Sequence, residues 1–478
     1  MVSWNRPVAR RWLAMLGLLA LAACAAQPDL PSKSSPQQPQ AAIKPTSTQP
    51  TSTLEAAPSA RGPVLAANQL IPGLSLKGPT PESVPPGQPG VLARPTPDAA
   101  GLVRVGLLVP LTGPSAPVGQ ALLNAAQMAL FDVGDERIVL QAYDTKGTPE
   151  AAMEAADTAL SHGAQLLLGP VFSAEARAIA PKAAAAGVNV IAFSTDPAVA
   201  DSHVFVIGFL VQEQVRQIVA YANARNLKRF AVLAPDTAYG QSVVEALKEI
   251  VPTRGGQLNQ ISFFQPDGKD LHDVVRRLAA FDRRKDALDL QRSELVGKDD
   301  EISQLALKRL ERLETIGEVE FDTILLPDQG SRLTQAATLL PFFDIDPGRV
   351  QLLGTLLWNT PGLGREPVMI GGVYPAPPPD TTRQFFTRYR EFYGQAAPAI
   401  ATHGYDALAL AAVLARSAGP GAFSAESIAA NTGFAGVDGI FRFLPNGLSQ
   451  RGFAIMQVTR DGSTMVQPAP ITFEAVQF

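Results

Sequence analysis

From residue 102 onward the chain alternates apolar runs with amphipathic segments, and this alternation constrains the fold more than any other feature. Residues 103–110 form an almost continuous run of valine and leucine side chains, typical of a strand buried on both faces. After a turn, residues 119–133 place Leu122, Ala126 and Leu130 at helical spacing. Repetition of this unit predicts a parallel β-sheet with helices on both faces.

The alternation occurs in two series of similar size. The first occupies residues 102–209, and the second begins with a helix expected at 212–226 and a strand expected at 229–235. Two such series predict an α/β protein with two doubly wound lobes rather than one large sheet. We expect a cleft between the two lobes.

Residues 282–320 depart from this pattern because acidic and basic residues crowd together there, as in Lys-Asp-Asp-Glu and Lys-Arg-Leu-Glu-Arg-Leu-Glu. Acid and base pairs at helical spacing support a solvent-exposed helix weakly. We therefore expect a charged helical insertion in the second lobe. Whether this surface is only solvated or also binds a partner stays open.

The first 23 residues have the features of a signal peptide. Three arginines precede the apolar run 12–23, which is too short to span a bilayer as a permanent helix. The run ends in Leu-Ala-Ala before Cys24, the only cysteine, and this ending resembles the lipobox of exported bacterial lipoproteins. The resemblance implies that Cys24 is lipidated. Because Ala25 follows rather than an aspartate, it also implies anchoring at the periplasmic side of the outer membrane.

Residues 24–100 are rich in proline and poor in aromatic side chains, with sixteen prolines between positions 25 and 100. Such a composition cannot bury enough apolar surface to fold. We interpret the segment as a tether between the lipid anchor and the domain formed by residues 101–478.

The composition argues against several classes of function. The net charge of −4 gives no electrostatic footprint for a nucleic acid. Four histidines lie far apart without metal-ligand spacing, and there is no nucleophile elbow or phosphate-binding glycine loop. We therefore predict no metal, no cofactor and no catalytic residue, and hence a protein that is not an enzyme.

Three motifs in the folded part are similar to those of a known family. They are Asp-Thr-Ala-Tyr-Gly at 236–240, Tyr-Asp-Ala-Leu at 405–408, and Gly-Ile-Phe-Arg-Phe followed by Asn-Gly at 439–447. Together with the order of strands over residues 102–459, they resemble the leucine/isoleucine/valine-binding branch of the type 1 periplasmic-binding fold. That fold implies three crossings of the chain between the lobes. We place lobe 1 at about 102–205 and 373–439, and lobe 2 at about 206–372 and 440–478.

A narrower resemblance comes from the lipobox, the tether, the charged insertion before Phe-Asp-Thr-Ile-Leu-Leu-Pro-Asp at 321–328, and Gly-Thr-Leu-Leu-Trp at 354–358. Together these features look like a penicillin-binding protein activator, a non-enzymatic lipoprotein that stimulates a class A penicillin-binding protein, which builds peptidoglycan. Enterobacterial members carry a helical repeat domain where this chain has only the tether. This difference makes the insertion 282–320 a candidate contact surface. The alternative is a substrate-binding lipoprotein of an ABC importer for branched-chain or related amino acids.

The resemblance also implies a set of ligand-binding residues in the cleft. In amino-acid-binding relatives, hydroxyls and helix amides at the strand ends hold the ligand carboxylate, and an aromatic side chain forms a wall. The matching candidates are Thr112, Ser115, Ser173, Ser194, Thr195, Tyr239 and Trp358. Equally, Ser194 and Thr195 are the residue types expected in caps and turns beside an empty cleft. No acidic partner for a ligand ammonium is identifiable, because the matching loop reads Trp-Asn-Thr at 358–360.

Overall fold

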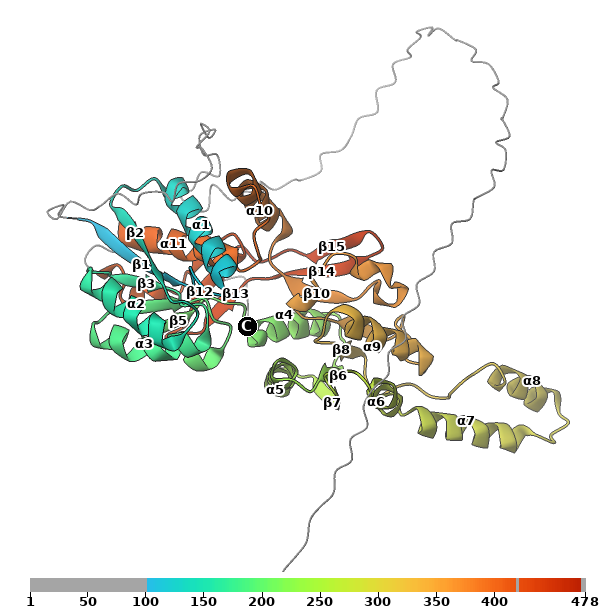
Figure 1. Cartoon of the computed structure of the whole chain (residues 1–478). Helices are drawn as coiled ribbons and strands as arrows, with labels where there is room; N and C mark the ends of the chain where they lie inside the picture. The colour runs from blue at the N-terminus through green and yellow to red at the C-terminus, as the bar shows by residue number, and fades with distance from the viewer. Residues whose placement is uncertain (1–100, 418–420, 474–478) are drawn as a thin grey trace, which may run out of the picture. The chain divides into compact units, whose positions relative to one another are not determined.

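The computed structural model describes residues 101–417 and 421–473 (Figure 1). The signal peptide, Cys24 and the tether, all expected within residues 1–100, lie outside the described residues. Among the residues that are described, no helix combines the length and apolar character needed to cross a lipid bilayer.

The first lobe contains a parallel five-stranded sheet with the order β2-β1-β3-β4-β5. Its strands are β1 (Val103–Val109), β2 (Ile138–Asp144), β3 (Leu166–Leu168), β4 (Asn189–Ala192) and β5 (Val204–Val206). Its helices are α1 (Ala116–Val133), α2 (Pro149–Ser161), α3 (Ser173–Ala185), α10 (Pro379–Tyr393) and α11 (Ala401–Ser417), with short turns at η2 (Pro197–Val199) and α12 (Ala425–Ile428). Helix α2 begins at Pro149 directly after its cap residue Thr148, whose hydroxyl accepts a hydrogen bond from the Ala151 amide at 3.3 Å.

The two faces of this sheet bury separate apolar clusters. Leu107 and Val109 of β1 point into a core shared with α1, α10 and α11, whereas Leu108 points into a core shared with α2 and α3. Because successive side chains of a strand alternate between faces, a strand covered on both sides must be apolar throughout. The continuous run at 103–110 has this property.

The second lobe contains a seven-stranded sheet with the order β15-β14-β10-β9-β8-β6-β7. Its strands are β6 (Arg229–Pro235), β7 (Gln257–Phe264), β8 (Thr323–Leu325), β9 (Gln351–Leu353), β10 (Val373–Ala376), β14 (Ala454–Thr459) and β15 (Gly462–Gln467). The first five are parallel, and β14 and β15 complete the edge as an antiparallel pair. Helices α4 (Val211–Asn223) and α5 (Ala238–Thr253) share one core, and α6 (Leu271–Leu278) and α9 (Gly330–Phe342) share the other. The short turns η3 (Leu356–Trp358), η4 (Leu363–Arg365) and η5 (Pro367–Met369) follow β9. The α/β fold class expected from the sequence is confirmed.

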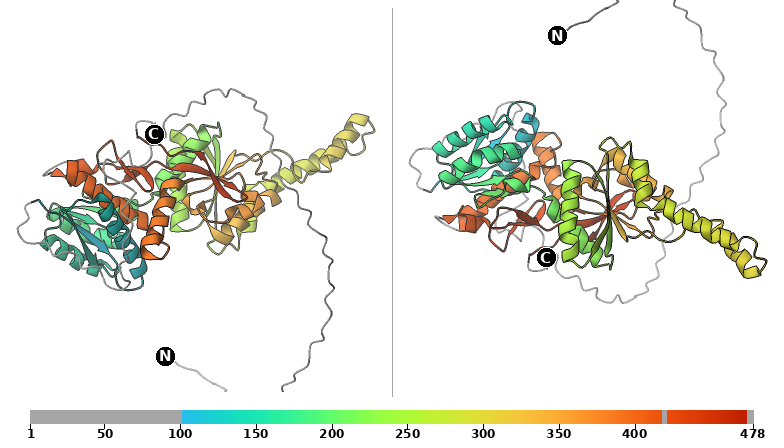
Figure 2. Two further views of the ribbon diagram at one scale, coloured as in Figure 1. Left: turned by 90° about the horizontal axis from the view of Figure 1, so that it is seen from above. Right: turned by 90° about the horizontal axis from the view of Figure 1, so that it is seen from below.

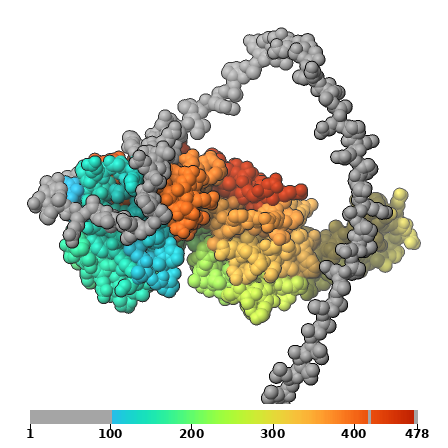
Figure 3. Space-filling view, turned by 45° about the horizontal axis from the view of Figure 1, so that its top comes forward, coloured from blue at the N-terminus to red at the C-terminus, as the bar shows by residue number. Residues whose placement is uncertain are grey.

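A third, antiparallel sheet completes the first lobe. It consists of β11 (Phe434–Gly436), β12 (Gly439–Phe443) and β13 (Ser449–Arg451). Phe443 of β12 lies edge-on to Phe205, with ring centroids 5.5 Å apart, and belongs to the core beneath the first sheet. Segments far apart in the sequence therefore build one lobe, and the space-filling view shows the early and late segments side by side on its surface (Figure 3).

The chain passes between the two large sheets three times, after β5, after β10 and after β13. Two of the expected boundaries need correction. Residues 373–376 belong to lobe 2, because β10 pairs with β9 and β14 of the second sheet. Residues 440–451 belong to lobe 1, because Phe441 and Phe443 pack into its core. The glycine and proline cluster at 371–379 contains a buried strand, and the crossing lies only at its end.

The charged segment forms a helical hairpin, α7 (Phe281–Leu295) and α8 (Glu301–Leu310), inserted between α6 and β8 (Figure 2). Its base is fixed by Arg284, a buried side chain whose guanidinium donates to the carbonyl oxygens of Gly317 and Asp344 at 3.0 and 3.2 Å. In contrast, α8 contains no buried residue. The hairpin is therefore attached through α7 and exposed along α8.

Candidate functional site

The loops that follow β1, β3 and β4 carry the polar side chains predicted for the first half of a ligand site. Because these parallel strands are neighbours in the sheet, their carboxyl ends lie at the same edge. Thr112 and Ser115 follow β1, Ser173 follows β3, and Ser194 and Thr195 follow β4. The structure therefore brings these five candidates to one edge of the first sheet.

Thr112 is held by Asp144, the last residue of the neighbouring strand β2. Its hydroxyl donates to Asp144 Oδ2 at 2.5 Å, and the amides of Leu111 and Lys146 donate to Oδ1 at 2.8 and 2.9 Å. Burial raises the pKa of Asp144, but these hydrogen bonds outweigh it, so the pKa lies below its ordinary value. Asp144 was not among the predicted site residues, although its position at the end of a strand was a signal for it.

Ser115 and Ser173 lie at the starts of helices α1 and α3. Ser115 is the residue before α1 and does not cap it with its side chain, and Ser173 is the first residue of α3. Both side chains are half-buried. A helix start with free amides suits an anionic ligand group, but at α1 Pro117 has no N–H and the amides of Ala116 and Val118 already donate to the carbonyls of Gly113 and Ser115.

Ser194 and Thr195 differ in their surroundings. Ser194 is buried, and its hydroxyl accepts a hydrogen bond from the Asp196 amide at 3.0 Å, which closes a local turn. Thr195 is exposed. Asp196 forms an ion pair with Arg177 and accepts from the Ala198 amide at 2.9 Å. Ser194 therefore already has a structural role.

Tyr239 is half-buried at the start of α5 in the second lobe. Its hydroxyl donates to Thr355 Oγ1, 2.9 Å away, in the loop after β9. Burial raises the pKa of Tyr239, and the hydrogen bond to Thr355 opposes this only in part. The ring therefore stays neutral and links two loops at the carboxyl edge of the second sheet.

Trp358 is not available to bind a ligand, so the prediction that it lines the ligand site is wrong. Its side chain is 0% exposed, and its indole N–H donates to the Leu326 carbonyl at 3.0 Å. A Cβ atom on Gly354 would lie only 2.1 Å from the indole ring, and one on Gly372 only 2.8 Å from it. The two glycines thus form a socket that holds Trp358 inside the lobe.

Two carboxylates stand at the carboxyl edge of the second sheet, after β6 and β8, and both have partners. Asp236 accepts a hydrogen bond from the Gln241 side chain at 2.8 Å. Asp328 is buried and bridges to Arg332 through two hydrogen bonds of 2.8 and 2.9 Å. A ligand ammonium would therefore have to compete with an internal partner at either carboxylate.

A buried ionic cluster lies beside the third crossing, where the chain leaves the first lobe after β13. Arg451 is buried with Asp406, with Nη1 and Oδ2 4.0 Å apart, and its Nη2 donates to the Ile207 carbonyl at 2.9 Å. Asp438 accepts from the Thr402 hydroxyl at 2.6 Å. Burial and the neighbouring Asp438 raise the pKa of Asp406 to about 7, while Arg451 opposes this shift. This cluster was not foreseen from the sequence.

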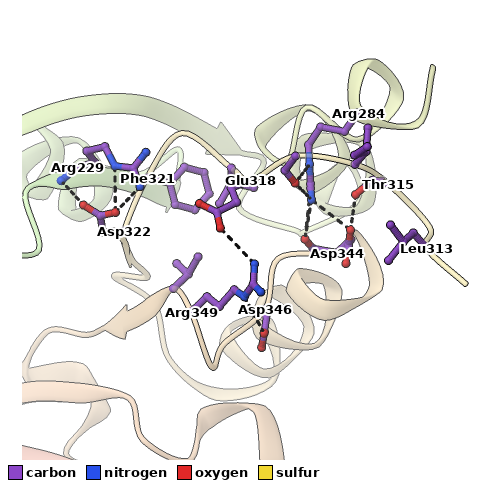
Figure 4. A pocket seen from close by; sticks show the side chains of 14 residues that line it. Arg229, Arg284, Leu313, Thr315, Glu318, Phe321, Asp322, Asp344, Asp346 and Arg349 are labelled. Atoms are coloured by element: carbon purple, nitrogen blue, oxygen red, sulfur yellow. Dashed lines mark hydrogen bonds and ion pairs between the residues drawn. The ribbon is translucent and has the colours of Figure 1, made fainter. Parts of the chain in front are cut away.

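A pocket of about 690 Å³ opens at the base of the helical hairpin (Figure 4). It lies at the amino ends of β6, β8 and β9, the edge opposite to the strand-end loops. Three arginine–carboxylate pairs line it: Arg229 with Asp322 at 2.9 Å, Arg284 with Asp344 at 3.1 Å, and Arg349 with Glu318 at 3.2 Å. Between them lie the apolar side chains of Leu313, Ile316, Val319, Phe321 and Val350.

These features define a two-lobed α/β binding protein with polar loops at the carboxyl edges of its sheets. Residues 102–463 match the family described as periplasmic binding protein, and the chain belongs to this family. The fold is that of substrate-binding proteins, which are generally not enzymes.

Two curated proteins are similar to part of the chain. The Leu/Ile/Val-binding protein BraC3 of Rhizobium johnstonii is 26% identical over 187 residues, which cover 37% of this chain and 51% of that protein. An uncharacterised protein of Rickettsia prowazekii is 27% identical over 178 residues, which cover 37% of this chain and 47% of that protein. The chain therefore spans about half the length of these curated relatives.

Solved structures show the same fold. A Rhodospirillum rubrum protein provisionally assigned to branched-chain amino acid ABC transport is 19% identical, with a TM-score of 0.61 over 76% of this chain and all of that chain. An ABC transporter substrate-binding protein from Desulfitobacterium hafniense, solved in complex with Leu, is 18% identical, with a TM-score of 0.53 over 76% of this chain and 99% of that chain. At this identity the similarity establishes the fold alone.

Proposed function

We propose that this protein is a non-enzymatic lipoprotein that binds and activates a class A penicillin-binding protein, and so regulates peptidoglycan synthesis. In this proposal Cys24 carries the lipid, and residues 24–100 span the distance from the periplasmic face of the outer membrane to the synthase. An activator needs only a surface that binds the active state of the synthase better than its inactive state.

The observation that carries the proposal is the helical hairpin α7–α8. A protein that only holds a small ligand between two lobes has no evident use for it. Several of its large apolar side chains are exposed, among them Leu290 at 63% and Val296 at 66%. Exposed apolar side chains gathered on one element are typical of a protein-binding surface.

The base of the hairpin offers a second contact region. The pocket beside Arg284 and Arg349 combines apolar lining with charged pairs at its rim, as protein interfaces do. Of the pairs that line it, Arg349 with Glu318 is the most exposed. An approaching chain can replace either member of that pair at small cost, because exposed ion pairs contribute about 1 kcal/mol or less.

The strand-end loops also support the proposal, because several of their candidate ligand-binding groups are already engaged inside the protein. Thr112 and Ser194 are engaged in internal hydrogen bonds, and Trp358 is buried. Asp236 and Asp328, the acids at the carboxyl edge of the second sheet, both have partners. These contacts favour a protein that kept the binding fold while its cleft lost the ability to recognise an amino acid.

Binding to the synthase tests this proposal directly. The chain from residue 101 to 478 contains all four apolar cores of the described residues. It is passed over each immobilised class A penicillin-binding protein of the same organism. We expect saturable binding that is weakened by Leu290→Glu/Val296→Glu on the hairpin. The matched control is Phe131→Glu, an exposed apolar residue of α1 in the first lobe.

The second candidate function is amino-acid binding for an ABC importer. It is favoured by the similarity to BraC3 and by the free positions of Ser115, Ser173 and Thr195 at one sheet edge. Titration calorimetry with leucine, isoleucine and valine separates the two candidates. Tight binding of one of these amino acids, together with no affinity for any class A synthase, would replace our proposal with this one.

A further inference from the structure

Helix α8 has two faces with different surroundings. Ser303, Ala306, Leu307 and Leu310 are half-buried against α7, and Arg292 of α7 donates to the Leu310 carbonyl at 2.8 Å. The opposite face carries Ile302 and Leu305, which are 81% and 51% exposed. Residues 302, 305 and 309 of α8, and residue 312 in the turn after its end, recur every three or four positions, so they form one continuous stripe. This stripe has no partner among the described residues.

The charges along the stripe are divided between its two ends. Asp299, Asp300 and Glu301 outnumber Lys298 at the start of α8, whereas Lys308, Arg309 and Arg312 outnumber Glu311 at its end. The helix dipole accounts for such a distribution in part, since acids stabilise a helix start and bases a helix end. It does not account for two large apolar side chains left uncovered between them.

We propose that the outer face of α8 pairs with the same face of a second copy of this chain, with the two helices antiparallel. A two-fold axis near Leu305 would place Ile302 against the aliphatic stem of Arg309 of the second copy. It would also bring Asp299 and Glu301 opposite Arg312 and Arg309 of that copy. Each contact occurs twice by symmetry, so the surface is complementary to itself. Antiparallel pairing also aligns the two helix dipoles favourably.

The distribution of charge around α8 argues against two other partners for its outer face, a lipid membrane and a protein of a single charge sign. A membrane surface is disfavoured because the most exposed apolar residue of α8, Ile302, lies beside three acids, and anionic lipid repels acids. A partner of a single charge sign would meet repulsion at one end of the stripe. A second copy presents the opposite charge at both ends.

The association should be weak in solution. Two helices of ten residues cannot bury the roughly 1,200 Å² that a specific and stable interface requires. Two copies anchored to one membrane would meet at a much higher effective concentration. This last step rests on the proposed lipid anchor, whereas the pairing does not depend on the proposed partner, because α7 and the pocket at the hairpin base stay uncovered.

A charge-exchange experiment tests the pairing. Sedimentation of the full chain in mild detergent measures the monomer–dimer equilibrium for three proteins: the natural chain, D299K/E301K and R309E/R312E. The first variant carries bases at both ends of the stripe and the second carries acids at both ends. Each should dimerise about tenfold more weakly than the natural chain, because attraction becomes repulsion.

A mixture of the two variants tests whether the two helices pair in the antiparallel direction. In an antiparallel pair the basic ends of one variant face the acidic ends of the other, so an equimolar mixture should regain the affinity of the natural chain. The control E245K/D273K makes the same change of charge at exposed sites on α5 and α6 and should leave the equilibrium unaltered. The proposal is overturned by a natural chain that stays monomeric, by variants that dimerise normally, or by a mixture that fails to regain affinity.

Discussion

Asp406 of α11 and Arg451 of β13 lie buried beside one another, with Oδ2 and Nη1 4.0 Å apart, at the third crossing of the chain between the lobes. Neither of these two atoms has a hydrogen-bond partner among the described residues. The other oxygen of Asp406 accepts from the Val437 amide at 2.7 Å, and Arg451 also reaches the Ile207 carbonyl of the first crossing. The ionisation of Asp406 is therefore tied to the stability of the crossings.

We predict that stability falls as the pH rises from 6.5 to 8 and that Asp406→Asn flattens this dependence. The pKa of Asp406 is raised to about 7 by burial and by Asp438, against 3.8 for a free carboxyl. The folded state thus holds a proton that the unfolded state has lost, so the contribution disappears as the pH rises through 7. Urea unfolding across this range measures it. An equally steep dependence in Asp406→Asn would contradict the assignment.

Comparison with Asp406→Asn removes the opposing effect of His403, because both proteins keep that residue. Burial lowers the pKa of His403 below 6.5, so the folded state binds fewer protons there than the unfolded state does. Its contribution therefore increases stability as the pH rises through 6.5 and levels off about one pH unit above that value. His403→Gln should therefore make stability fall more steeply with pH up to about pH 7.5.

Trp358→Ala should destabilise the second lobe by about 4 kcal/mol, because it empties the socket between Gly354 and Gly372. Trp358→Phe should cost less, about 2 kcal/mol, since it keeps most of the volume but removes the indole hydrogen bond, so that the Leu326 carbonyl keeps only the one from the Asp328 amide. Denaturant unfolding measures both values. If Trp358 instead contacted a ligand, both variants would retain full stability.

Arg284→Ala should loosen the hairpin without unfolding the lobe. The substitution removes the guanidinium's hydrogen bonds to the carbonyls of Gly317 and Asp344 and its ion pair with Asp344, which costs about 2 kcal/mol of local stability. Hydrogen exchange of residues 281–320 should accelerate about thirtyfold, while that of β6 and β8 stays unchanged. Arg283→Ala, at an exposed position paired with Glu320, is the matched control. Equal acceleration in both variants would rule out this anchoring role of Arg284.

Lipidation at Cys24 gives a chemical prediction. The chain produced in bacteria fed a labelled fatty acid should carry the label, and Cys24→Ser should carry none, because Cys24 is the only thiol. Label retained by the Cys24→Ser variant would show that the anchor lies elsewhere.

The sequence predicted the fold well because a strand buried on both faces appears in the sequence as a nearly continuous apolar run, as in residues 103–110. It placed the lobe boundaries less well, because residues 371–379 contain the buried strand β10 beside glycines and prolines that indicate a loop. The composition of a segment does not reveal whether its backbone pairs with strands 80 residues later.

The candidate site was only partly predictable. Position after a strand located Thr112, Ser173 and Ser194 correctly at one sheet edge. The sequence could not show that Ser194 closes a turn or that Trp358 is enclosed, because both facts depend on contacts made across the fold. The pairing of Asp406 with Arg451 could not be predicted for the same reason, since the two residues lie 45 positions apart in the sequence.

The central claim is that this protein activates peptidoglycan synthesis. Its most direct test is the rate of glycan polymerisation and cross-linking by a purified class A penicillin-binding protein of the same organism, with and without residues 101–478. We predict an acceleration that saturates with concentration and is reduced by Leu290→Glu/Val296→Glu. An unchanged rate with every class A synthase of the organism would contradict the claim.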